Sequence, residues 1–147
     1  MNVTRIQTGL LVLLSTLSSL AAASECVPSV KDGWVRLPPG DMPMMAGFGR
    51  IENGCKTPVT VVGVKSAAFG DVSLHETRIV DGVSRMRPMP KLPIAAGGSA
   101  TMQPGGLHLM LMQPRSALKP GSKVTVEFEL EGGGKVLGEF VARKPGE

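Results

Sequence analysis

Short apolar runs with alternating or β-branched residues follow one another along most of the chain, separated by Gly, Pro, Asn and Asp. Downstream of residue 24, no helical periodicity persists for ten residues. Period-two alternation bounded by turn residues predicts β-strands, here at residues 34–37, 46–52, 59–64, 73–80, 83–88, 99–103, 107–112, 123–130 and 135–142. Many short strands at this spacing favour one all-β domain, an antiparallel sandwich or barrel.

Aromatic residues are few, and the sequence has no Tyr. We expect Trp34, Phe48, Phe69, Phe128 and Phe140 to lie in the core rather than on a binding surface. The net charge is +4, and the Lys and Arg residues are scattered. Nucleic-acid binding by stacking on a basic surface is therefore not expected.

The first residues have the pattern of an export signal. Arg5 is the only charged side chain among residues 1–23, an apolar stretch covers 10–20, and small residues follow at 21–23. This order predicts a cleaved signal peptide at 1–23 and a mature domain at 24–147. A retained signal anchor is the alternative, but the stretch is shorter than the roughly 20 residues that span a bilayer.

Two cysteines, Cys26 and Cys55, remain after the expected cleavage. In an oxidising export compartment an isolated pair predicts a disulfide. A redox-active or metal-binding thiol pair is the alternative, although the two are too far apart in sequence for a C-x-x-C motif. Glu25 directly before Cys26 argues against lipid attachment at that cysteine.

The dipeptide Asp81-Gly82 lies between two β-like runs and predicts a tight hairpin turn with positive φ. In a hairpin centred there, Thr77 faces Met86 and His75 faces Pro88. His75 and Thr77 share one strand face because side chains alternate. His75 and Met86 are then diagonal neighbours, roughly 7–8 Å apart and within reach of long side chains.

A second pair of the same types, His108 and Met110, lies two residues apart and also shares a strand face. Together with His75 and Met86 they form a set of two imidazoles and two thioethers. Thioether sulfur suits Cu(I) better than hard cations, and a blue-copper centre would also need a Cys thiolate. The set therefore favours reversible Cu(I) binding, although spacing alone leaves simple core packing open.

Other residues near this set have simpler explanations. Met112 shares the face of His108 and is expected to pack rather than bind metal, as are Met89 and Met102. The run Met42, Met44 and Met45 could form a rim that shields copper or docks a partner, or could serve the surface or core. Arg85 and Arg87 should alternate onto the face opposite Met86.

The complete spacing is His75, ten residues, Met86, twenty-one residues, then His108-Leu109-Met110. This H-x10-M-x21-H-x-M pattern resembles the signature of the periplasmic copper chaperones called PCuAC. The flanking segments 72–76, 81–88 and 104–112 are similar as well, and the likeness extends from about Gly33 to Phe140.

The resemblance implies a cupredoxin-like, Greek-key β-sandwich in the periplasm that holds one Cu(I) per chain on the four motif residues. It implies a non-enzymatic, monomeric carrier, without membrane insertion, that delivers copper towards the CuA centre of cytochrome c oxidase. Expected partners are oxidase subunit II or a Sco-type protein. Two departures are Glu76, near which many relatives carry Met, and a C-terminal segment 142–147 without His or Met. We therefore expect a single copper site.

Two other functions compete with copper carriage. An exported β-sandwich interaction or assembly module would use its Met residues for packing and would bind no metal tightly. A copper-dependent redox enzyme would show turnover or a stable Cu(II) spectrum, which the thioether-rich set disfavours. No Ser-His-Asp, Cys-His or paired-carboxylate arrangement in the sequence supports catalysis.

Overall fold

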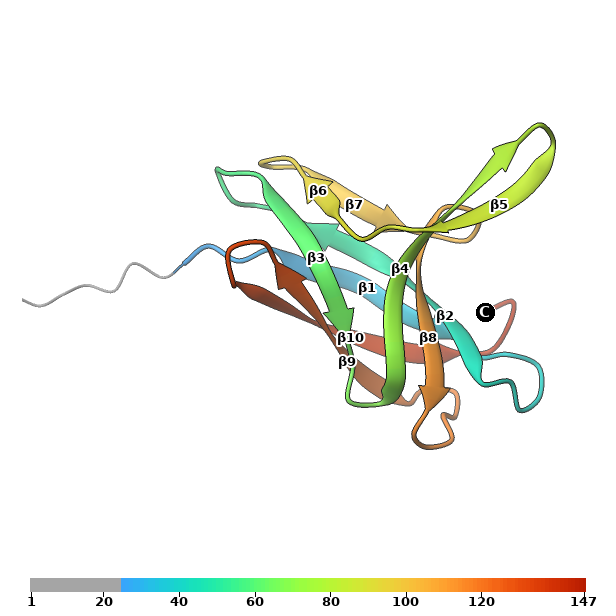
Figure 1. The fold of residues 1–147 in the computed structure, drawn as a ribbon. Helices are drawn as coiled ribbons and strands as arrows, with labels where there is room; N and C mark the ends of the chain where they lie inside the picture. The colour runs from blue at the N-terminus through green and yellow to red at the C-terminus, as the bar shows by residue number, and fades with distance from the viewer. Residues whose placement is uncertain (1–24) are drawn as a thin grey trace, which may run out of the picture.

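The computed structural model describes residues 25–147, so the expected signal peptide lies outside the described part of the chain. The described residues form ten strands and no helix (Figure 1). The strands are β1 (Ser29–Arg36), β2 (Met44–Glu52), β3 (Val59–Lys65), β4 (Phe69–Val80), β5 (Val83–Pro88), β6 (Leu92–Ile94), β7 (Ser99–Met102), β8 (Leu107–Pro114), β9 (Lys123–Leu130) and β10 (Lys135–Arg143). No helix in residues 25–147 has the length and apolar character needed to cross a membrane.

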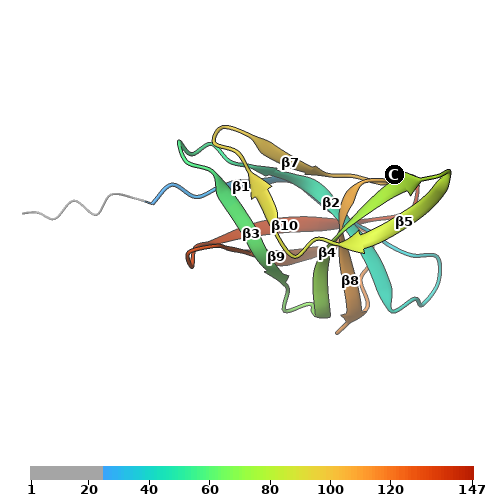
Figure 2. The same ribbon diagram turned by 45° about the horizontal axis from the view of Figure 1, so that its top comes forward.

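The strands form one mixed sheet in the order β5-β4-β8-β2-β1-β10-β9-β3-β6, with β7 paired to β2. The sheet does not close, and it folds over so that β4 and β8 cross β1, β2 and β10 (Figures 1 and 2). This arrangement confirms the all-β sandwich predicted from the sequence. All nine predicted strands are present, and β6 is an additional one.

One pairing differs from the expected antiparallel pattern. Strands β1 and β10 run parallel, with Trp34 opposite Val141 and Val35 opposite Ala142. Every other paired ladder is antiparallel. Parallel neighbours need a long connection, and here nearly the whole domain lies between the two strands.

A single apolar cluster fills the space between the layers. All four Phe residues are buried, as predicted. Trp34 is only half-buried and lies outside that cluster, with its ring 4.7 Å from the ring of Phe48 and 5.6 Å from the guanidinium carbon of Arg143. Trp34 therefore covers the outer face of β1 and β2 instead of filling the core.

The end of the sandwich near the N-terminal segment is held by a disulfide and a buried amide. Cys26 and Cys55 are joined, 29 positions apart in the sequence. Asn53, which is 1% exposed, donates to the carbonyl oxygens of Thr57 (3.0 Å) and Ala95 (3.1 Å), while its Oδ1 accepts from the backbone N–H of Cys55. The amide thus links the β2–β3 connection to the β6–β7 connection.

Candidate metal centre

The β4–β5 hairpin has the predicted register. Thr77 lies opposite Met86 and His75 lies opposite Pro88. Asp81 and Gly82 both have positive φ, 52° and 75°, as a tight hairpin turn of this type requires. The turn residues therefore set the alignment that brings His75 and Met86 onto one face.

Strand β8 lies directly beside β4, so the two halves of the motif share one continuous surface. His75 is opposite His108, and Ser73 is opposite Met110. Leu109 and Leu111, which alternate with these residues along β8, point into the core and are fully buried. Because strand side chains alternate, the imidazoles and thioethers all lie on the outer face of the sheet.

Two of the predicted ligands are already in contact. Nε2 of His108 lies 3.2 Å from Sδ of Met86. The rings of His75 and His108 are nearly parallel, with their centroids 6.2 Å apart. His108 is 8% exposed, whereas Met86 is 53% exposed. The set thus combines one buried imidazole with a thioether that remains open to solvent.

The backbone carbonyl of Gly106 orients His108. It accepts a hydrogen bond from Nδ1 of His108 at 2.9 Å and another from the backbone N–H of Thr77 at 3.0 Å. A carbonyl oxygen can only accept, so Nδ1 carries the proton, and Nε2 of the neutral ring keeps its lone pair. In this tautomer the unprotonated Nε2 faces the sulfur of Met86.

His75 also has a neighbour that restricts its ring. Oγ of Ser73 lies 3.4 Å from Nδ1 of His75 on the same strand face. Ligating histidines in metal sites are usually held through their second ring nitrogen in this way. Neither Ser73 nor Gly106 was identified from the sequence. The period-two spacing of Ser73 before His75 is the signal that could have identified the first.

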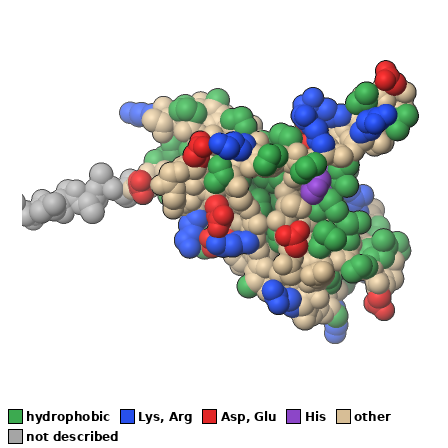
Figure 3. Space-filling model, in the orientation of Figure 1, with side chains coloured by type: hydrophobic (Ala, Val, Ile, Leu, Met, Phe, Trp, Pro, Cys, Tyr) green, Lys and Arg blue, Asp and Glu red, His purple; other side chains and the backbone are tan. Residues whose placement is uncertain are grey.

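A cavity of about 380 Å³ opens beside His108, and we call it the thioether cavity. Met86, His108, Met110 and Met44 all line it, while His75 does not. Figure 3 shows histidine atoms reaching the surface among hydrophobic side chains. The structure therefore brings three of the four predicted ligands to one cavity and places His75 next to it.

The donor set is neutral and soft. Within residues 25–147, no three His, Cys, Asp or Glu side chains gather where they could hold a metal ion, so a carboxylate- or thiolate-rich site is not found there. Nε2 of His108 and the sulfur of Met86 face each other at 3.2 Å, and sulfur with imidazole favours Cu(I) over hard cations. The residues present thus suit a soft monovalent metal.

Residues 28–141 match the family described as "Putative lipoprotein LpqE-like". The chain belongs to the LpqE-like family. A relative within reach of sequence comparison is "Putative lipoprotein Lxx21020" of Leifsonia xyli subsp. xyli (strain CTCB07), 32% identical over 105 residues. The match covers 71% of this chain and 62% of that protein, so the chain spans less than two thirds of its relative.

Solved structures share the fold of this LpqE-like chain. CuI-DR1885 from Deinococcus radiodurans is 26% identical with a TM-score of 0.65, over 86% of this chain and 85% of that one. The copper-bound PCuAC domain from PmoF2 is 22% identical with a TM-score of 0.64, over 79% of this chain and 92% of that one. The expected likeness to PCuAC thus holds for the fold, while the family shown by sequence is LpqE-like.

The outer half of the β4–β5 hairpin, residues 77–86, projects from the body of the LpqE-like domain, and we call it the arm (Figure 1). Among residues 25–147, β5 pairs with β4 alone and is an edge strand of the sheet. Glu76, at the base of the arm, bonds Arg78 and Arg87 across the face opposite Met86. The hydrogen bonds that Arg78 and Arg87 donate, with that of Arg78 the larger contribution, lower the pKa of the Glu76 carboxyl.

The remaining methionines of the LpqE-like domain differ in their surroundings. Met45 and Met102 are buried in the core, and Met89 packs against it. Met112 is half-buried on the outer face of β8, opposite Met44 of β2. Packing therefore accounts for Met45, Met89 and Met102, and Met112 lies beside the site.

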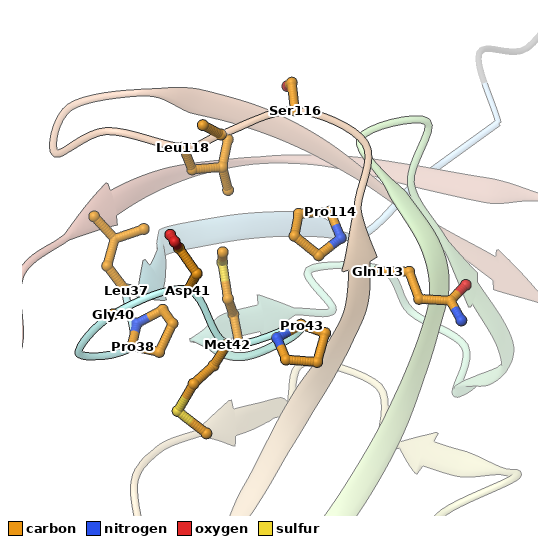
Figure 4. Close-up of a pocket in the computed structure, with 12 residues that line it drawn as sticks. Leu37, Pro38, Gly40, Asp41, Met42, Pro43, Gln113, Pro114, Ser116 and Leu118 are labelled. Atoms are coloured by element: carbon orange, nitrogen blue, oxygen red, sulfur yellow. The ribbon is translucent and has the colours of Figure 1, made fainter.

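Met42 lies in a different place from Met44. It lines a second cavity of about 420 Å³ together with Asp41 and Pro43 of the β1–β2 loop and Leu118 of the β8–β9 connection (Figure 4). We call this space the loop cavity. Met42 does not line the thioether cavity, whereas Met44 does.

Proposed function

We propose that this protein binds one Cu(I) through His75, Met86, His108 and Met110 and carries it as a chaperone, without catalysing a reaction. The observation that supports this most strongly is the approach of His108 Nε2 to the Met86 sulfur, at 3.2 Å. Copper-bound structures with the same fold, PmoF2 and CuI-DR1885, support the same metal.

The chemistry of the site favours carriage over redox turnover. Thioether and imidazole ligands are neutral, so binding Cu(I) requires no proton release from them, and the soft sulfurs favour the reduced ion. A blue-copper centre would use a thiolate, but both cysteines are joined in a disulfide. Met86, being half-exposed, leaves the ion accessible to an acceptor.

The destination of the copper follows from the resemblance to PCuAC chaperones. We propose delivery in the periplasm towards the CuA centre of cytochrome c oxidase, through subunit II or a Sco-type protein. Export is supported by the predicted signal peptide and by the lipoprotein description of the family and of the relative Lxx21020. Transfer from the loaded protein to an isolated CuA domain, followed by the CuA visible spectrum, would test the recipient.

The binding proposal is tested by titrating purified protein with Cu(I) in the presence of a competing chelator. We expect one Cu(I) per chain for the wild type. Met86→Leu/Met110→Leu should weaken binding more than about 100-fold, because even outer-shell partners of metal ligands contribute 10- to 100-fold. Leucine nearly conserves side-chain volume, so the fold should be retained.

Met42→Leu provides the control, since Met42 lines the loop cavity and should bind like the wild type. Equal Cu(I) affinity of the wild type and the double variant would contradict the assignment of Met86 and Met110 as ligands. A wild type without tight copper binding would favour an interaction module. The exposed arm residues Ile79 (70%) and Val83 (53%) would then be its contact surface.

A further inference from the structure

We propose that Met44 is a fifth copper-binding side chain, which replaces His75 in a second coordination set with Met86, His108 and Met110. This inference rests on the proposed Cu(I) function. It explains why three of the four motif residues, but not His75, line the thioether cavity together with Met44. The cavity would be the place where copper leaves the protein.

Strand pairing places Met44 on the correct face. Strand β2 lies beside β8, with Met44 opposite Met112 and Ala46 opposite Met110. Met44 is therefore the diagonal neighbour of Met110 on the same outer face, a relation in which long side chains reach each other. His75 lies on the other side of β8, on β4. Met44 and His75 thus lie on opposite sides of β8, the strand that carries His108 and Met110.

Met44 is also available for binding. It is 38% exposed, whereas the next residue, Met45, is 9% exposed and belongs to the core. Met45 also lines the cavity but packs into the core, so Met44 is the residue of this pair that lies on the outer face with the ligands. Besides His108, the polar side chain in that wall is Arg36, whose guanidinium has donors only and therefore does not compete for copper.

The exchange balances chemically. The bond from copper to the His75 nitrogen breaks, and a bond from copper to the Met44 sulfur forms. Both ligands are neutral, and copper stays Cu(I), so neither an electron nor a proton has to be supplied. A set of three thioethers and one imidazole still favours Cu(I). Copper can thus move from the β4 side towards the open cavity in a single ligand step.

The test compares His75→Ala, Met44→Leu and the double variant by Cu(I) titration and X-ray absorption. Met44→Leu alone should stay within about threefold of the wild type, because His75 completes the set. His75→Ala should still bind, with three sulfurs and one nitrogen around copper. Adding Met44→Leu to His75→Ala should remove one sulfur and weaken binding at least tenfold further.

His75→Ala/Met42→Leu is the matched control and should bind like His75→Ala, since Met42 lines the loop cavity (Figure 4). Equal affinities of His75→Ala and His75→Ala/Met44→Leu would overturn the inference, and so would complete loss of binding in His75→Ala. In both cases the wild type would still bind Cu(I). Failure of the wild type itself to bind would instead refute the proposed function.

Discussion

At the scale of single residues, the site depends on groups that hold the ligands as much as on the ligands. One carbonyl, that of Gly106, accepts from both the His108 ring and the Thr77 backbone. It therefore fixes the tautomer of an imidazole on β8 and at the same time ties β4 to the turn before β8. The φ of 79° at Gly105 forms that turn, and a side chain there would be strained.

Asn53 plays a comparable role away from the site, and its loss can be measured. Asn53→Ala removes the acceptor of the buried Cys55 N–H and one donor to each of the Thr57, Ile94 and Ala95 carbonyls, and an unsatisfied buried group costs about 1–3 kcal/mol. We expect the free energy of unfolding in urea to fall by about 2–3 kcal/mol. Asn53→Asp keeps Oδ1 as the acceptor for the Cys55 N–H but places its second carboxylate oxygen among carbonyl oxygens. This variant should therefore be no more stable than Asn53→Ala. A loss below about 0.5 kcal/mol for the alanine variant would contradict this role.

At the scale of elements, β4 belongs to two structures. Its first half packs Phe69, Val72 and Leu74 into the core, and its second half forms the arm with β5. His75 lies at the boundary, while Met86 is carried by the arm alone. The position of Met86 relative to His108 therefore depends on a hairpin that few contacts outside its own two strands stabilise.

Gly82→Ala tests this dependence. Nothing lies within 4 Å of the added Cβ, so the cost is the left-handed backbone, about 1–2 kcal/mol. We expect the Cu(I) affinity to drop about fivefold or more, because the strained backbone lies in the arm that positions Met86. Gly121→Ala is the matched control, with φ of 86° and an equally open site in another turn. It should lower the melting temperature without changing copper affinity, and equal copper affinity in both variants would show that the arm does not position Met86.

Local chemistry explains which elements could be predicted. Asp81 and Gly82 specify both a turn and a register, so the opposition of Thr77 and Met86 was predictable and is confirmed. Strand β6 has only three residues with Pro93 at its centre, and Pro weakens a strand signal. The diagonal placement of Met44 and Met110 depends on the pairing of β2 with β8, for which no local pattern exists.

At the scale of the whole molecule, the disulfide and the thioether cavity are separate features. Neither cysteine lines the thioether cavity, and the N-terminal segment leaves the sandwich on the side away from the arm (Figure 1). Stability and copper binding should therefore respond differently when the disulfide is lost.

Cys26→Ser/Cys55→Ser should lower the free energy of unfolding by about 3–4 kcal/mol, the loop-closure estimate for a separation of 29 residues. Denaturant unfolding measures this loss. Under conditions where the variant is folded, its Cu(I) affinity should match that of the wild type. A parallel fall in affinity would instead show that the disulfide shapes the metal site.

The parallel pairing of β1 with β10 has a consequence for the order of folding. Strand β1 occupies the middle of the sheet, between β2 and β10, and its partner is the last strand of the chain. The sheet can be completed only after residue 143 is available, and contacts so distant in sequence form slowly. Trp34 is the only tryptophan and lies beside both Phe48 and Arg143. Its fluorescence therefore reports the moment at which the two ends of the domain come together.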